Sequence, residues 1–190
     1  LSANGPMIHK RALWAAAFVA TWLAAVHAGH GDEAAGGAPL SGIAVSGIAV
    51  YGIARVVDGD TLVVGGRRLT LWGIDAPELG QSCLKPDGET FRMGAFAASF
   101  LQELLQTQPL TCELAAGQDG AEPAALCRFP GGEPLNAALV SGGLAYADPE
   151  RGELYAALEA DARAGRRGLW AMDCVPPWEW RRGGRVNAGE

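Results

Sequence analysis

Histidine is almost absent from this 190-residue chain, and its three histidines, His9, His27 and His30, all stand within the first 30 residues. Catalytic mechanisms that use a histidine as base or ligand are therefore excluded for the rest of the chain. Positive charge is also scarce, with 15 Lys and Arg against 21 Asp and Glu and a formal net charge of −6. Because tight binding to nucleic acid normally uses many Lys and Arg contacts with phosphate, this composition argues against a strong nucleic-acid binder.

The apolar run near the N-terminus is short for a membrane-spanning helix. "ALWAAAFVATWLAAV" covers residues 12–26, whereas a spanning helix needs about 20 residues. "HKR" precedes the run and the small residues of "VHA" follow it, so residues 1–28 are expected to be upstream residues and an export signal that starts at Met7. The protein would then be periplasmic or secreted. The alternative is an uncleaved signal that tethers it to a membrane.

Paired CxxC motifs are missing although the chain has four cysteines, which argues against a zinc site. An even number of cysteines in an exported chain favours disulfides. Cys112 and Cys127 lie on two predicted strands joined by a turn-rich segment, so we expect them to pair with each other. Cys83 and Cys174 then form the second disulfide.

The composition divides the chain into a linker, one domain and a tail. Residues 29–49 are rich in Gly and Ala and are predicted to be a linker, and the five-residue repeat "GIAVS GIAVY GIARV" starts within it and runs over residues 42–56. Five residues match the face of neither a helix nor a strand, and three copies are too few for a solenoid. We interpret the first two copies as a duplication and the third as the opening strand of a domain over residues 50–182. Residues 183–190 are predicted to be a flexible tail.

The domain is predicted to be α+β and mainly β. Three strands follow one another in residues 53–74, with Gly65-Gly66 as a hairpin turn, and two more are expected at 110–114 and 124–129. Helical patterns cover 88–106, 134–143 and 149–170. Five short strands with an inserted helix favour a five-stranded Greek-key barrel of the OB type with about three helices, a fold that binds oligonucleotides. The closing "PPWEWRR" is predicted to be a peptide packed on the barrel surface.

Three acidic residues are candidates for a metal site. Asp60 follows a turn glycine, Asp75 ends a predicted strand and Glu78 follows in the next turn. Two aspartates from neighbouring strands could form half of a Ca²⁺ cage, because Ca²⁺ prefers several oxygen ligands. Glu78 could then deprotonate a water for attack on phosphorus. In the alternative interpretation, Asp58 and Asp60 are ordinary turn residues and Asp75 caps a strand end.

"VVDGDTLVV" followed by "GIDAPE" resembles the thermonuclease, or staphylococcal-nuclease-like, family. The resemblance continues through "LNAALVSGGLAYA" to the closing "PPWEWRR", over roughly residues 50–182. It implies the OB-type barrel with three helices, export from the cell, and Ca²⁺-dependent cleavage of DNA and RNA.

Carried over by the resemblance, Asp60 and Asp75 match the calcium-binding carboxylates and Asp58 matches a nearby supporting acid. Glu78 matches the presumed general base. Ala76 stands where many members have threonine, and its backbone carbonyl could still face the metal.

Two departures concern the catalytic arginines. The family's first arginine lies five residues before the second metal aspartate, and here that position is Thr70. The second falls on Glu122, and the nucleotide-contacting tyrosine of the same element falls on Gly120. Arg68 shares the strand face of Thr70 and is the candidate substitute cation. Because an arginine aimed at the transition state can be worth roughly 10³- to 10⁵-fold in rate, the resemblance implies a degenerate nuclease.

Three hypotheses remain open from the sequence. The first is an exported monomer that keeps the Ca²⁺ acids and binds nucleotides, single-stranded nucleic acid or an envelope protein weakly, without efficient cleavage. The second is an active Ca²⁺-dependent endonuclease that uses Arg68 or an arginine near the C-terminus. The third is a purely structural scaffold for an envelope partner.

Overall fold

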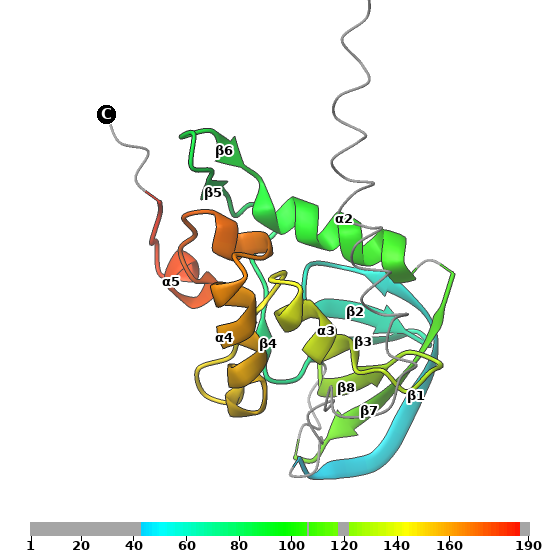
Figure 1. Cartoon of the computed structure of the whole chain (residues 1–190). Helices are drawn as coiled ribbons and strands as arrows, with labels where there is room; N and C mark the ends of the chain where they lie inside the picture. Colours follow the sequence, from blue (N-terminus) through cyan, green and yellow to red (C-terminus); the bar gives the residue numbers. More distant parts are fainter. Residues whose placement is uncertain (1–42, 106, 118–121, 187–190) are drawn as a thin grey trace, which may run out of the picture. The chain divides into compact units, whose positions relative to one another are not determined.

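The computed structural model describes residues 43–105, 107–117 and 122–186. Five strands pair in a closed ring in the order β1-β2-β3-β8-β7 (Figure 1). The pair β3–β8 is parallel and the other pairs of the ring are antiparallel. The five strands are β1 Val45–Val56, β2 Thr61–Val64, β3 Arg67–Leu71, β7 Pro109–Ala115 and β8 Ala124–Arg128. The predicted five-stranded OB-type barrel in a mainly β protein is confirmed.

Strand β1 begins earlier than the repeat pattern predicts. It starts at Val45, so the second copy of the repeat belongs to the strand, and the prediction that the third copy opens it is wrong. The register against β7 shifts between Val45 and Ala49, where Gly47 has a φ of 77°. From Val45 to Ala49 strand β1 advances four residues while β7 advances two, from Ala115 to Glu113, so β1 contains two additional residues at this irregularity.

The hairpin between β2 and β3 has the expected two-glycine turn. Val64 pairs with Arg67, and the two residues between them, Gly65 and Gly66, have φ values of 56° and 80°. Both central residues of such a turn need a positive φ, which glycine adopts without strain.

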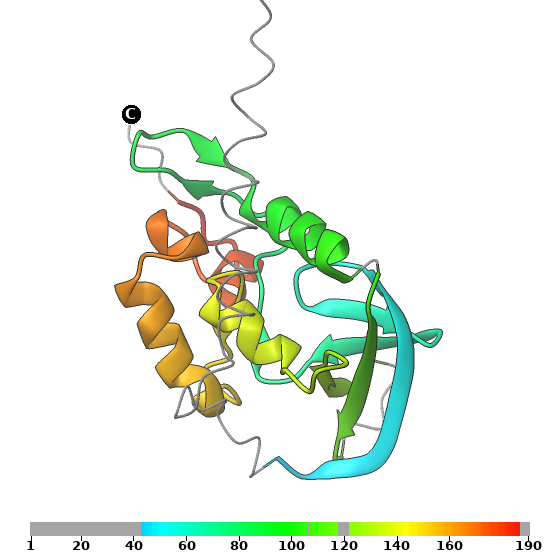
Figure 2. The ribbon, with the colours of Figure 1, turned by 45° about the vertical axis from the view of Figure 1, so that its right-hand side comes forward.

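Helix α2, Met93–Leu105, lies across one end of the barrel (Figures 1 and 2). Its inner face is apolar at helical spacing and contributes to the core through Met93, Ala97, Leu101 and Leu105. The start of the predicted helical segment is extended instead, because β6, Thr90–Phe91, pairs with β5, Cys83–Leu84.

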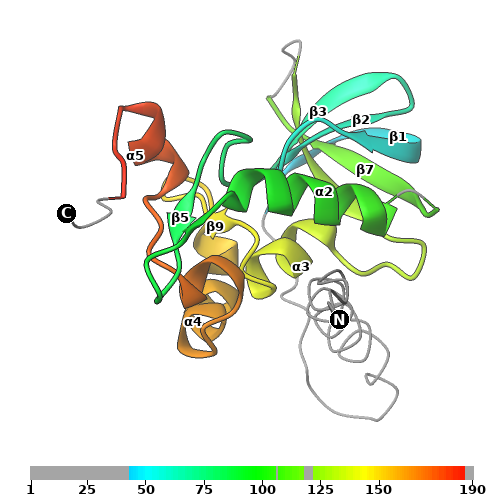
Figure 3. The same ribbon diagram turned by 90° about the horizontal axis from the view of Figure 1, so that it is seen from above.

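Helices α3 Leu135–Ser141, α4 Ala156–Ala164 and α5 Pro177–Arg181 lie together on one side of the barrel (Figure 3). Two 3₁₀ turns flank α4, at Glu153–Tyr155 and Gly168–Ala171. About three helices were expected, and the described residues contain four α-helices. The fourth is α5, because Pro177 begins a helical turn in the segment that was expected to be a surface peptide.

Buried Asn136 of α3 connects the barrel to the segment that follows β3. Its side-chain oxygen accepts a hydrogen bond from the N–H of Cys127, and its amide donates to the carbonyls of Trp72 and Ala125. The chain then continues into β4, Ile74–Asp75, which pairs with β9, Tyr146–Ala147. These contacts set the position of the turn that carries Asp75 and Glu78.

Both predicted disulfides are present. Cys112 and Cys127 stand directly opposite each other on β7 and β8, and Cys83 of β5 is bonded to Cys174 ahead of α5. Within the part of the chain that the structure describes, no helix has the length and apolar character to cross a membrane. The predicted signal over residues 1–28 and the position Gly120 lie outside the described residues.

Candidate functional site

A cleft of about 710 Å³ opens beside the barrel between the turns that carry the predicted acids and helix α5. Six acidic residues line it: Asp58, Asp60, Asp75, Glu78, Asp148 and Glu150. Three arginines line it as well, Arg151, Arg181 and Arg182. The structure therefore brings the four predicted acids together, and it adds positive charge that the strand positions lack.

Asp60 links two of the turns that form the cleft. One of its carboxylate oxygens accepts the N–H of Ala76 at 2.8 Å, and the other accepts the hydroxyl of Thr61 at 3.2 Å. Asp58 in turn accepts the N–H of Asp60 at 3.2 Å. Burial raises the pKa of Asp60 to about 7, the negative charge of Asp58 adds to this rise, and the hydrogen bond from Ala76 opposes it. Asp60 is therefore in contact both with Asp58 and with the turn that contains Ala76.

Arg181 holds Asp75 and Glu78 with a single guanidinium group. It donates to the two oxygens of Asp75 at 3.0 and 2.6 Å and to one oxygen of Glu78 at 2.9 Å. The hydrogen bond to Asp75 is the main reason that the pKa of Arg181 is raised above its usual value. A planar guanidinium fits a carboxylate in this two-pronged manner. The predicted metal ligand and the predicted general base therefore share a cation of the protein itself.

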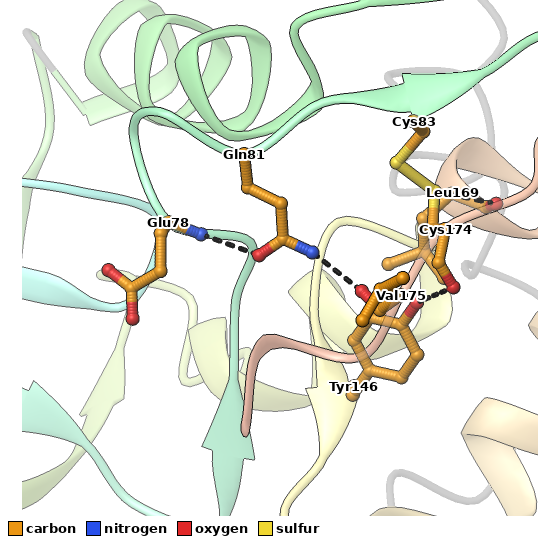
Figure 4. Close-up of a disulfide and its surroundings, with 7 residues drawn as sticks. All are labelled: Glu78, Gln81, Cys83, Tyr146, Leu169, Cys174 and Val175. Carbon is orange, nitrogen blue, oxygen red and sulfur yellow. Dashed lines mark hydrogen bonds between the residues drawn. A yellow bond between two sulfur atoms is a disulfide. The ribbon is translucent and has the colours of Figure 1, made fainter. Parts of the chain in front are cut away.

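The chain entering α5 is attached to the turn that carries Glu78 (Figure 4). Gln81 is fully buried, and its side chain accepts the N–H of Glu78 at 3.2 Å and donates to the carbonyl of Val175 at 2.6 Å. The Cys83–Cys174 disulfide lies next to this bridge. Covalent and polar links thus join two segments that lie far apart in the sequence.

Two tryptophans orient α5 itself. The ring of Trp178 packs edge-on against Tyr146, with 5.5 Å between the ring centroids. Trp180 covers Gly80, where an added Cβ would stand 3.8 Å from the indole ring. Because both contacts fix the short helix against its neighbours, Arg181 is held toward the cleft.

Thr70 and Glu122 stand where the family has its two arginines, and each has a contact of its own. Thr70 lines the cleft, and it pairs with Thr61 on β2. Arg68, the predicted substitute cation, lies 2.7 Å from Glu122, measured from Nε to Oε1. Neither Arg68 nor Glu122 is among the described residues that line the cleft. The positive charge nearest to Asp75 and Glu78 comes from α5 and not from Arg68.

A family model described as staphylococcal nuclease homologue matches residues 68–172, more than half of the chain. The chain belongs to the staphylococcal nuclease homologue family. Among characterised proteins, the succinoglycan biosynthesis protein ExoI of Rhizobium meliloti (strain 1021) is 34% identical to it over 119 residues. This alignment covers 62% of the chain and 62% of the length of ExoI. The family match begins after Asp60 and ends before Arg181.

Members of the staphylococcal nuclease homologue family generally depend on Ca²⁺, an ion that takes about six to eight oxygen ligands. Within the described ranges, no group of three or more Asp, Glu, His or Cys side chains is gathered closely enough to hold a metal ion. Both oxygens of Asp75 and one of Glu78 accept hydrogen bonds from Arg181. In this arrangement the residues do not fit Ca²⁺.

Arg181 is one of the cleft residues that sequence reasoning did not single out. It stands 106 residues after Asp75 and belongs to a basic C-terminal stretch that looks like a solvated tail. The available signal was "PPWEWRR", in which Pro177 starts a helix and two tryptophans precede the arginines. The active-nuclease hypothesis included an arginine near the C-terminus, but it did not say which arginine.

Proposed function

We propose that this member of the staphylococcal nuclease homologue family binds nucleotides or single-stranded nucleic acid weakly and cleaves phosphodiesters poorly. The contact of Arg181 with Asp75 and Glu78 carries the proposal. The guanidinium already occupies one oxygen of Glu78, so that oxygen is not available to accept a proton from water. Thr70, at the strand position of the missing arginine, supplies a hydroxyl and no charge.

The charges of the cleft support weak binding. Six carboxylates face three arginines, and Arg151 is already engaged with Asp148 at 2.9 Å and stacked on Trp72. Phosphate contacts with Lys and Arg supply most of the affinity for nucleic acid. A cleft with more acids than cations therefore retains a phosphate chain only through one or two contacts, of which Arg182 is the first candidate.

Export of the protein is part of the same proposal. Two disulfides support an oxidising compartment, because disulfides persist mainly in exported proteins. The relative ExoI is a succinoglycan biosynthesis protein. We therefore name a component of polysaccharide synthesis in the cell envelope as the first protein partner to test.

Active cleavage is the second candidate, and the arginines of the cleft favour it. Arg181 has 48% of its side chain exposed, so it has room to leave the carboxylates and contact a phosphate. In that case Asp75 and Glu78 become free for the ion and the water that the family uses. The two candidates differ in whether Arg181 leaves when substrate is present.

The test is a cleavage assay on single-stranded DNA with Ca²⁺ and with chelator, using protein made in an oxidising compartment. A Thr70→Arg, Glu122→Arg double variant runs beside the natural protein. Silence from the natural protein and cleavage by the variant support the proposal. Ca²⁺-dependent cleavage by the natural protein contradicts it, and Arg181→Gln then shows whether that residue supplies the cation. Silence from both folded proteins moves the interpretation to a structural scaffold.

A further inference from the structure

We propose that Arg181 is a tethered counter-ion that takes the place of a divalent cation between Asp75 and Glu78. A divalent cation binds these acids only after it displaces the guanidinium. The inference deepens the proposed function at the same site. Its test measures ion binding rather than cleavage, so the two can fail separately.

The first argument is the charge of the two carboxylates. Asp75 has 13% of its side chain exposed and Glu78 has 33%. The negative charges of both carboxylates lie in the same small volume. Two partly buried carboxylates repel each other unless a cation lies between them. Here that cation is Arg181, which contacts three of their four oxygens. Arg181 offsets one of the two negative charges without a dissolved ion.

The second argument is that the protein prepositions the guanidinium. The chain before α5 is bonded to β5 through Cys83–Cys174, and the backbones of Leu84 and Asp173 exchange two hydrogen bonds at 2.8 and 2.9 Å. The bridge through Gln81 adds a buried polar link. A group held on a short tether has an effective concentration of about millimolar or more. A free ion must compete with that concentration at all times.

The third argument is the fork geometry. Arg181 uses two nitrogens on the two oxygens of Asp75, which a point charge does not reproduce. A divalent cation would instead need oxygens from several directions. The contact is therefore suited to a guanidinium and unsuited to a metal in the same position.

The experiment is calorimetric titration of the full-length, disulfide-bonded protein with CaCl₂ at neutral pH. Arg181→Gln is compared with Arg182→Gln, which removes the same charge from the same cleft at the next residue of the chain. We expect Arg181→Gln to raise the affinity for Ca²⁺ about tenfold or more, equivalent to about 1.4 kcal/mol. Arg182→Gln is expected to change it by less than about threefold, as a change in overall charge does.

Three results would overturn the proposal. Equal gains in Ca²⁺ affinity in the two variants would mean that only the net charge of the cleft determines the affinity. Natural protein that already binds Ca²⁺ as tightly as Arg181→Gln would mean that the guanidinium does not compete. Absence of Ca²⁺ binding in a folded Arg181→Gln would mean that the acids are not a cation site at all.

A measurement on the natural protein covers the case in which Arg181→Gln does not fold. Nitrogen-15 NMR of the arginine side chains distinguishes a clamped guanidinium, with slow rotation of its terminal nitrogens, from a free one. Arg181→Lys identifies the signal by its loss. We expect Arg181 to be clamped and millimolar Ca²⁺ to release it. Free rotation of Arg181 without any ion would overturn the proposal.

Discussion

The side chain of Gln81 donates a 2.6 Å hydrogen bond to the carbonyl of Val175, which lies 94 residues further along the chain. The same side chain accepts the N–H of Glu78. One buried amide thus connects the turn that carries the predicted base with the segment that leads to Arg181. The predictions below test this connection and the acids around it.

Replacing Gln81 by leucine should destabilise the fold by about 1–3 kcal/mol, because two backbone polar groups then lose their partner in a buried place. Chemical denaturation measures the change in the free energy of unfolding. Glu89→Gln is the control, since the ion pair of Glu89 with Lys85 is at the surface and should contribute less than about 1 kcal/mol. Equal effects of the two changes would mean that the bridge through Gln81 adds nothing.

The two disulfides should differ in their contribution to stability. A cross-link stabilises mainly by restricting the unfolded chain, and more so for a longer loop. Cys83 and Cys174 are 91 positions apart and Cys112 and Cys127 are 15 apart. On this basis the loop-entropy model gives about 4.5 kcal/mol for the first and about 3 kcal/mol for the second. Thermal unfolding of the two double Cys→Ala variants measures the order, and a larger loss from the shorter loop would contradict it.

Asp60 should make stability fall with rising pH between about 4 and 7. Burial raises its pKa from 3.8 to about 7. In this window the folded protein keeps a proton that the unfolded chain has released, so the slope of the unfolding free energy against pH is negative. The slope from one such group is at most about 1.4 kcal/mol per pH unit.

The check on Asp60 is a comparison of pH profiles. Denaturation of natural protein and of Asp60→Asn is followed from pH 4 to pH 8. As pH rises, the free energy of unfolding of the natural protein should fall relative to that of Asp60→Asn. The difference between the two should become constant above pH 7. A constant difference over this range would show that Asp60 titrates normally in the folded protein.

Gly94 should tolerate no side chain. A Cβ at this position would collide with the carbonyl of Glu78, which is backbone and cannot rotate away. Gly94→Ala is therefore expected to destabilise the protein by about 1–3 kcal/mol or more and to shift the turn that carries Glu78. Gly131→Ala is the matched control, since nothing lies within 4 Å of an added Cβ there. Heat denaturation of the two variants measures the difference in stability. Similar melting temperatures would show that the backbone at Gly94 does not approach the carbonyl of Glu78 so closely.

Much of the fold was predictable because it rests on local patterns. The alternation around Leu62 and Leu69 and the turn at Gly65-Gly66 specify a hairpin within a few residues. Both disulfides could be predicted from the even number of cysteines and from the two strands that carry Cys112 and Cys127. The bulge at Gly47 was missed because a glycine in a repeat does not show which partner strand will shift its register.

The sequence by itself determined the barrel, the pairing of the cysteines and the placement of Asp60, Asp75 and Glu78 in adjoining turns, since these depend on periodicity and short connections. It also determined that Thr70 and Glu122 carry no positive charge. Only the tertiary structure decided that Arg181 lies between Asp75 and Glu78 and that Arg68 is paired with Glu122. The physical reason is distance along the chain: the contacts of Arg181 depend on how α5 docks, and that docking rests on packing and cross-links between segments about a hundred residues apart.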